Sequence, residues 1–262
     1  GILVQNHLQA DGVDLRTGMS DLKFSKTDDG IRMTFKQEGK TCEESVEKVL
    51  IAVGRAPNLE GLNLETAGVN FHDKGVEVDD RLRTSNPAIF ACGDVCSKYQ
   101  FTHAADFMAR IVIQNALFMG RKKMSDLVIP WCTYTSPEVA HVGISEQEAE
   151  SEGIDIDTYT VDLAEVDRAI LDGETDGFVK IHTKKGSGNI LGATIVAAHA
   201  GDLINEIVLA MTQGIGLGSL ANAIHPYPTQ AEAVRRVGDL YNRTRLTPRV
   251  KSLFDTWLRW RR

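Results

Sequence analysis

The sequence predicts a protein of mixed α/β and α+β class. Near the N-terminus, two segments of alternating character, 21–26 and 31–36, flank the turn Asp28-Asp29-Gly30 and predict a β-hairpin. Three further strand-like segments lie in the second half of the chain, at 155–163, 177–183 and 190–198. An amphipathic segment at 201–214 predicts a helix beside them. We therefore expect a strand-rich N-terminal part and a C-terminal antiparallel sheet with helices.

Length and composition are those of a globular protein with more than one domain. The 262 residues are 42% hydrophobic and 25% charged. The net charge of −7 argues against nucleic-acid binding, and no apolar run is long enough to predict a transmembrane segment. The chain begins without Met, in what resembles the interior of a strand at residues 1–4, so we expect it to be part of a longer protein.

The cysteines show no spacing typical of a metal site. They are Cys42, Cys92, Cys96 and Cys132, of which two form a C-x3-C pair that matches neither zinc sites nor thioredoxin-like motifs. We expect free thiols, no bound metal and a cytoplasmic location, because thiols stay reduced there.

Two short apolar strands of the N-terminal half are expected to end in loops. Residues 46–53 form a continuous apolar run typical of a buried strand, and the loop 54–58 ends it. After an exposed turn at 73–75, a second apolar strand at 88–92 stops abruptly at Gly93-Asp94.

The Gly93-Asp94 turn and the helix after it predict a ligand site. Gly93 lets a ligand approach the backbone, and Asp94 can accept two hydroxyl hydrogen bonds from a ribose or polyol. The next helix is expected from 101 to about 119, with Thr102 as its N-cap. The free N–H groups and positive dipole end of such a helix suit an anionic ring edge or a phosphate.

The C-terminal half continues with strands and one capped helix. Residues 130–143 predict two strands separated by a proline. Ser145 then begins a helix with a Ser-x-x-Glu start, and Gly153 ends it.

A stiff segment, His225-Pro226-Tyr227-Pro228-Thr229-Gln230-Ala231-Glu232, which we call the elbow, lies near the end of the chain. Its two prolines hold Tyr227 in extended backbone. Thr229 and Glu232 have the spacing of a capping box before the apolar run that follows. The elbow is expected to present His225, Tyr227 and Glu232 together. Alone, it favours a plain proline-capped helix start over a functional segment.

Four motifs follow one another along the first half of the chain. They are the loop 53–58, Thr84, the segment 89–94 and the helix opening at His103-Ala104. In this order they resemble the pyridine nucleotide–disulfide oxidoreductases, the flavoproteins that include dihydrolipoamide dehydrogenase, glutathione reductase and mercuric reductase. The resemblance extends over essentially the whole chain.

The resemblance implies two cofactors, FAD and NAD(P)H. Asp94, with Gly93 beside it, corresponds to the family aspartate that hydrogen-bonds the ribityl chain of FAD. His103 and Ala104, after Thr102, lie where backbone amides approach the flavin edge, which becomes negative on reduction. Gly54 resembles the family glycine near the nicotinamide dinucleotide.

The resemblance also gives the elbow a catalytic role with one departure. In the family's thiol-disulfide members, a histidine before Pro-Thr acts as acid–base catalyst in the partner subunit, oriented by a glutamate five residues later. Here Tyr227 stands in its place, while Glu232 is where expected. His225 lies two residues earlier, roughly 6–7 Å along an extended backbone, too far to replace it.

A tyrosine in this place resembles the mercuric reductase branch. That branch normally ends in a vicinal cysteine pair, whereas this chain ends without one. A phenol, with a pKa of about 10, is also a poor proton shuttle at neutral pH. The electron acceptor is thus expected to be a small molecule, a disulfide or a metal ion.

The resemblance divides the chain into four parts. Residues 1–52 would end the NAD(P)-binding domain, 53–124 would belong to the FAD-binding domain, 125–245 would form the dimerisation domain, and 246–262 would be a basic amphipathic tail. The parent protein would be roughly 200 residues longer, because the family's FAD and NAD(P) fingerprints and its redox cysteine pair are not in this chain.

The sequence is compatible with two functions of different classes. The parent is expected to be a homodimeric, FAD-dependent NAD(P)H oxidoreductase that serves cell redox homeostasis. Alternatively, the chain as it stands is a non-catalytic homodimerisation module.

An apolar stripe marks the tail, with Leu253, Phe254, Trp257 and Leu258 at helical spacing and three arginines at the end. We expect this stripe to dock on the protein's own surface, in preference to an anionic membrane surface.

Overall fold

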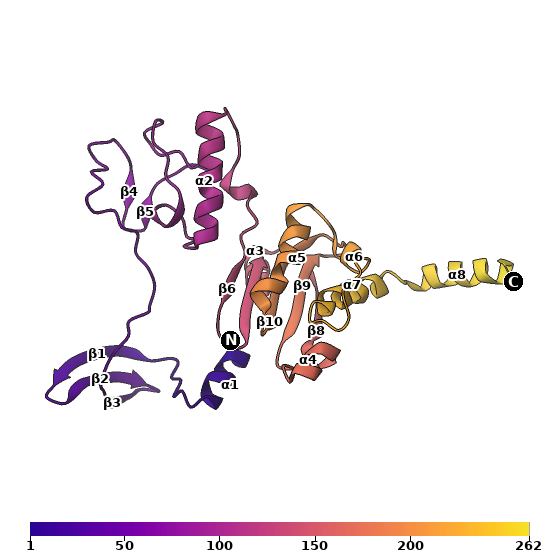
Figure 1. The fold of residues 1–262 in the computed structure, drawn as a ribbon, viewed down its shortest axis with the longest axis horizontal. Helices are drawn as coiled ribbons and strands as arrows, with labels where there is room; N and C mark the ends of the chain where they lie inside the picture. Colours follow the sequence, from indigo (N-terminus) through magenta and orange to yellow (C-terminus); the bar gives the residue numbers. More distant parts are fainter. Residues whose placement is uncertain (262) are drawn as a thin grey trace.

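The computed structural model describes residues 1–261, and Figure 1 shows them as distinct lobes with a projecting C-terminal helix. No helix among these residues combines the length and the apolar character needed to cross a membrane.

The first lobe is a three-stranded antiparallel sheet preceded by a short helix. Its elements are α1 Ile2–Ala10, β1 Ser20–Thr27, β2 Gly30–Gln37 and β3 Lys40–Val46. The strands pair in the order β1-β2-β3, which confirms the hairpin predicted around residues 28–30.

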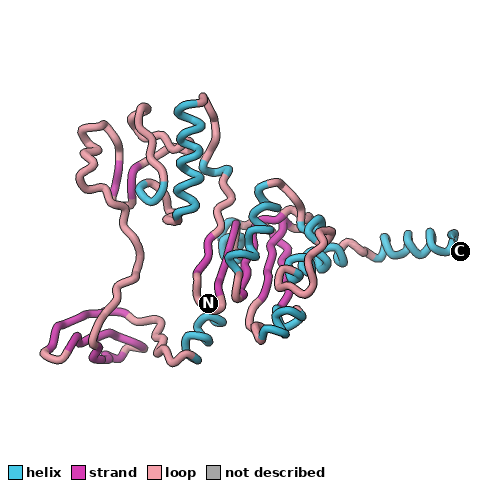
Figure 2. The backbone as a smooth tube through the Cα atoms, viewed as in Figure 1, coloured by secondary structure: helices cyan, strands magenta, loops and turns pink. Residues whose placement is uncertain are grey.

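Two predictions for this region were wrong. Residues 2–4 belong to α1, so the chain does not begin inside a strand. The strand expected at 46–53 is also absent, because β3 ends at Val46 and the following segment has no regular structure. Leu50 and Val53 are 90% and 93% exposed, since none of the described residues covers their apolar side chains. Figure 2 shows this segment as a long loop that leads to β4.

The second lobe is held together by one helix. Its elements are β4 Phe71–His72, β5 Gly75–Val76, the 3-10 turns η1 Gly93–Val95 and η2 Met124–Asp126, and α2 Thr102–Leu117. Leu82, Ala104, Met108 and Ile111 form its buried core. The exposed turn expected at 73–75 is confirmed for Asp73 and Lys74, which connect β4 to β5, whereas Gly75 is buried and begins β5.

The strand expected at 88–92 does not form. Only one bridge, between Arg83 and Phe90, joins this segment to another. The Thr84 hydroxyl and amide both bond to the carbonyl of Ile89, so a tight turn takes the backbone groups that a sheet would need.

The third lobe is a five-stranded antiparallel sheet with two helices packed on it. The strand order is β6-β7-β10-β9-β8, and every strand predicted in this half is present. The strands are β6 Trp131–Thr133, β7 Glu138–Gly143, β8 Ile156–Asp162, β9 Phe178–Lys184 and β10 Ile190–Ala197. The helical elements of this lobe are α3 Glu146–Glu152, η3 Leu163–Glu165, α4 Asp167–Asp172, α5 Ala200–Thr212, α6 Leu217–Leu220 and α7 Glu232–Thr244. The two that pack on the sheet are α5 and α7.

Burial of apolar faces fixes the helices on this sheet. Helix α5 contacts β7 and β10, while α7 contacts β8 and β9. Ile181, Ile195, Ile207 and Val237 are fully buried in the shared core. The start of α7, where the elbow ends, is therefore held by a large hydrophobic contact.

Of the two capping boxes predicted from the sequence, one is confirmed and one is wrong. The capping box at α3 is confirmed, because Ser145 Oγ accepts from the Glu148 amide and Glu148 accepts from the Ser145 amide. The box predicted at Thr229 and Glu232 is wrong. The Thr229 hydroxyl donates to the Pro226 carbonyl instead, and α7 begins only at Glu232.

The tail forms helix α8, Pro248–Arg261, which contains no buried residue. Figure 1 shows it projecting away from the five-stranded sheet. The expected docking on the protein's own surface is therefore wrong for this structure.

The third lobe, which we call the sheet domain, should lose stability when its core is truncated at Leu163. This side chain is fully buried, so Leu163→Ala should lower the free energy of unfolding by about 2–5 kcal/mol through lost burial and a cavity. Leu171→Ala is the matched control, because Leu171 is 73% exposed and its truncation should cost less than about 0.5 kcal/mol. Urea unfolding would measure both, and equal losses would contradict this description of the core.

Candidate functional site

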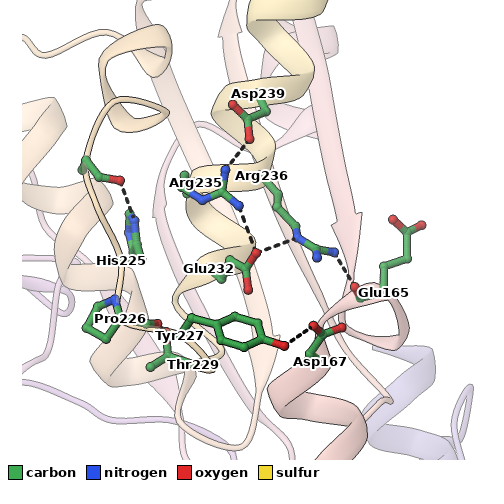
Figure 3. Close-up of polar contacts among 11 residues, drawn as sticks. Glu165, Asp167, His225, Pro226, Tyr227, Thr229, Glu232, Arg235, Arg236 and Asp239 are labelled. Atoms are coloured by element: carbon green, nitrogen blue, oxygen red, sulfur yellow. Dashed lines mark hydrogen bonds and ion pairs between the residues drawn. The ribbon is translucent and has the colours of Figure 1, made fainter.

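The elbow places Tyr227 at the surface of the sheet domain, against α4. The side chain is 71% exposed, and its hydroxyl donates a 2.8 Å hydrogen bond to Asp167 Oδ2 (Figure 3). Asp167 is the first residue of α4. Its carboxylate raises the pKa of Tyr227, first through the hydrogen bond and second through its charge, because a phenolate beside a carboxylate is unfavourable. The phenol is thus a neutral hydrogen-bonding group near pH 7.

Glu232 is buried at the start of α7 and binds arginines. Its Oε1 accepts from Arg235 Nη2 at 2.9 Å and from Arg236 Nε at 3.2 Å. Arg236 also donates to the carbonyl oxygen of Glu165, which precedes Asp167 by two residues (Figure 3). We call Glu232, Arg235 and Arg236 the arginine clamp. It links the end of the elbow to the segment that carries the partner of Tyr227.

The structure does not give Glu232 the orienting role expected from the sequence. Tyr227 bonds to Asp167, whereas Glu232 bonds to the clamp arginines. Glu232 Oε2 is buried and has no hydrogen-bond partner among the described residues. A buried carboxylate oxygen without a donor is costly, so this oxygen marks a place where a further donor would be stabilising.

His225 points away from Tyr227 toward α5. Its side chain is only 8% exposed, with Nδ1 3.0 Å from the Ala223 carbonyl and Nε2 3.0 Å from Glu206 Oε2. Both partners are hydrogen-bond acceptors, and they hold the ring from two sides. The expectation that the elbow presents His225 beside Tyr227 and Glu232 was wrong, because Glu206 draws the imidazole to the other side.

A second group of predicted residues lies on the second lobe, which we call the α2 lobe after its long helix. Gly93 has a φ of +78°, and a Cβ added there would lie 3.0 Å from the Cβ of Ala105, so glycine allows the close approach of η1 to α2. Asp94 follows it with a side chain that is 45% exposed and lies 3.7 Å from Arg55 Nη1. The loop containing Gly54 and Arg55 thus reaches the Asp94 carboxylate, although the two are far apart in the sequence.

The N-terminus of α2 offers free backbone donors. The first intrahelical bond runs from the Ala105 amide to the Phe101 carbonyl. Within residues 1–261 no acceptor binds the amides of Thr102, His103 and Ala104. Thr102 is not the N-cap that we predicted, because the cap position is Phe101 and no side chain caps the helix.

The His103 imidazole does not occupy the free amides. Its Nε2 donates to the Pro130 carbonyl at 2.7 Å, and the ring stacks on Phe101. The partly exposed carboxylate of Asp94, which also lies near Arg55, and the three donors of α2 are a donor–acceptor set that fits a hydroxylated, anionic ligand.

The four cysteines are free thiols, and two of them, Cys96 and Cys132, have a raised pKa. Burial raises the pKa of Cys96 to about 11, with Cys92 as a second cause. Burial and the Glu138 carboxylate raise the pKa of Cys132 to about 11. A thiol with such a pKa is almost fully protonated at neutral pH and is a poor nucleophile.

Sequence reasoning missed Asp167, Glu206 and the two clamp arginines. Arg235 and Arg236 lie three and four residues after Glu232, a helical spacing that signals ion pairs. Asp167 and Glu206 gave no local signal, because 60 and 19 residues separate them from their elbow partners.

Two family models match the chain. The model described as pyridine nucleotide-disulphide oxidoreductase matches residues 2–109, and the dimerisation-domain model of the same group matches residues 129–237.

Comparison of the chain with individual proteins points to the same group of enzymes. A mercuric reductase of Staphylococcus aureus is 35% identical over 233 residues, which are 88% of this chain and 43% of the relative. A dihydrolipoyl dehydrogenase of Thermus scotoductus is 33% identical over 240 residues, 90% of this chain and 52% of the relative. The HOCl-induced flavoprotein disulfide reductase of Escherichia coli matches in structure with a TM-score of 0.80 and 26% identity, over 91% of this chain and 55% of that one. The chain spans about half the length of the curated relatives it matches.

Removing the charge of Asp167 should make Tyr227 easier to ionise. Asp167→Asn keeps a hydrogen-bond acceptor but removes the carboxylate, so the pKa of Tyr227 should fall and its phenolate should form at lower pH than in the parent chain. An NMR titration of ring-labelled tyrosine would follow it, with Tyr159 as the internal control. An unchanged Tyr227 titration in Asp167→Asn would contradict the assigned cause.

Proposed function

The chain belongs to the pyridine nucleotide-disulphide oxidoreductase family, and we propose that it is the C-terminal portion of a homodimeric, FAD-dependent NAD(P)H oxidoreductase of the disulfide reductase type. The observation that carries the proposal is the presence of Asp94 and of the free α2 amides on one lobe, in a chain that matches a flavoprotein in structure. The divisions at residues 52, 124 and 245 remain part of the proposal.

The residues of the α2 lobe fit FAD. Asp94 would accept hydrogen bonds from the ribityl hydroxyls, next to Gly93, where a side chain would crowd Ala105. The amides of His103 and Ala104 would donate to the ring edge. When bound, FAD supplies two-electron transfer between nicotinamide and acceptor. The positive end of α2 favours negative charge at that edge. Gly54, with φ +131° and open space around its Cα, would let the nicotinamide dinucleotide approach.

Tyr227 would face the electron acceptor in the partner subunit. Its exposed ring is available to a second copy, and Asp167 fixes the direction of its hydroxyl proton. The hydroxyl lone pairs then remain free to accept a hydrogen bond or to contact a metal ion. Because its pKa is raised, Tyr227 would position the acceptor and would not act as a base. Glu232 supports the elbow through the arginine clamp, and His225 anchors it to α5.

The acceptor class is a small molecule, a disulfide or a metal ion, consistent with relatives named for mercuric ion and for dihydrolipoyl groups. As the family resemblance implies, the redox cysteine pair would lie outside this chain. Four free thiols suit a reducing compartment, so we place the protein in the cytoplasm, where it would contribute to cell redox homeostasis.

A second candidate is a non-catalytic homodimerisation module. The continuous core of the sheet domain favours it, because that domain has the packing needed to be stable by itself. A dimer of the 262-residue chain without NAD(P)H turnover would favour the module, whereas turnover by this chain would exclude it.

The full-length protein should carry bound flavin that depends on Asp94. We expect a flavin absorbance spectrum, and Asp94→Ala should weaken FAD binding at least ~10-fold, which corresponds to the loss of a charge-assisted hydrogen bond. Asp106→Ala is the matched control, since Asp106 lies on α2 but pairs with Arg110 at the surface. Absence of flavin after reconstitution would contradict the proposal.

The hydroxyl of Tyr227 should affect only the step that involves the acceptor. Tyr227→Phe in the full-length enzyme should lower kcat/KM for the acceptor by about 10-fold or more, as expected for a lost positioning contact, while the rate of flavin reduction by NAD(P)H stays unchanged. Stopped-flow absorbance separates the two half-reactions. Equal activity with the acceptor would show that the elbow is only structural.

A further inference from the structure

Helix α8 carries large apolar side chains that no other part of the described chain covers. Trp260 is 85% exposed and Leu253 is 69% exposed, and Phe254, Trp257 and Leu258 are about half exposed. No residue of α8 is buried, and Figure 1 shows the helix reaching away from the sheet domain. Exposing so many large apolar groups is unfavourable in water, which points to a partner surface.

These side chains lie on one side of the helix. At about 100° per residue, the six apolar residues occupy an arc of roughly 160°. They are Val250, Leu253, Phe254, Trp257, Leu258 and Trp260. Arg249 and Lys251 border this arc on its two edges, and Ser252, Asp255, Thr256 and Arg259 fill the opposite side. Arg261, in the last turn, falls within the arc, where its guanidinium lies over the ring of Trp257. We call the arc the apolar face of α8.

The charge of α8 is opposite to that of the chain. Helix α8 contains four cationic side chains, Arg249, Lys251, Arg259 and Arg261, against the single carboxylate of Asp255. The whole chain has a net charge of −7. Within residues 1–261, no cation of α8 forms a salt bridge with a carboxylate, although Arg261 lies over the ring of Trp257. The positive charge of α8 is therefore available to an anionic partner.

The combination fits a lipid surface better than a protein groove. Cationic side chains at the edges of an apolar face can extend to phosphates while their stems and the face enter the acyl region. Tryptophan prefers this boundary, because its ring is apolar and its N–H is polar. With 14 residues, α8 is about 21 Å long, too short to span a bilayer core of about 30 Å, so it would lie in the plane of the membrane.

We propose that α8 is an interfacial helix that docks the protein on the surface of an anionic lipid bilayer. The apolar face inserts among the headgroups, and the cationic side chains select anionic lipid. The short segment 245–247 connects α8 to α7, so docking through α8 would leave the α2 lobe and the elbow in solution. This inference stands on α8 alone and does not depend on the proposed oxidoreductase function.

Vesicle co-sedimentation of the 262-residue chain tests the proposal. Vesicles that contain phosphatidylglycerol should bind the protein, with a blue shift in tryptophan emission, and vesicles of pure phosphatidylcholine should bind at least ~10-fold more weakly. Leu253→Glu/Leu258→Glu should abolish binding by placing two carboxylates on the apolar face. Arg249→Glu/Lys251→Glu should weaken it ~10-fold or more.

The matched control for charge is Lys23→Glu/Lys26→Glu, which changes the net charge equally at two exposed positions of β1. It should leave vesicle binding unchanged, and urea unfolding checks that each variant is folded. Failure to bind anionic vesicles would overturn the proposal, as would equal binding to neutral ones or equal weakening by the control. Concentration-dependent assembly that disappears in Leu253→Glu/Leu258→Glu, without vesicle binding, would instead assign the face to a second copy of the chain.

Discussion

The arginine clamp is the interaction on which the elbow geometry depends. Glu232 is buried where α7 begins, and two arginines of the next helical turn neutralise its charge. One of them, Arg236, reaches the Glu165 carbonyl and so joins α7 to the segment before α4. Burying a carboxylate is unfavourable without such partners. The clamp thus sets the distance across which Tyr227 meets Asp167, and the hydrophobic core below α7 keeps it in place.

The elbow and the α2 lobe present two different chemistries. Asp94 and the α2 amides offer charge and hydrogen bonds that suit a bound cofactor, whereas Tyr227 offers a neutral phenol with a fixed proton direction. The resemblance implies a histidine where this chain has Tyr227, and we propose that the phenol positions the acceptor in place of shuttling a proton. Family membership establishes the fold of both parts. We propose that the elbow of one subunit and the α2 lobe of the other cooperate across a dimer, because Tyr227 and Asp94 are both exposed.

The sequence predicted elements whose signals are local. The hairpin near residues 28–30, the five strands of the sheet domain and the Ser145 capping box are confirmed because turn chemistry, alternation and caps act within a few residues. The strands expected at 46–53 and 88–92 are absent, since an apolar run forms a strand only beside another strand. The partners of Tyr227 and His225 come from distant segments, and no spacing rule reveals them.

We propose that Tyr227 serves the flavin site of the partner subunit, and activity measurements on hybrid dimers test this proposal. One subunit of the full-length protein would carry Tyr227→Phe and the other Asp94→Ala. If the elbow crosses the interface, the hybrid contains one site with an intact cofactor region and an intact elbow, and acceptor turnover should recover to about half that of the unmodified dimer. Turnover no higher than that of the two parent variants would contradict the claim.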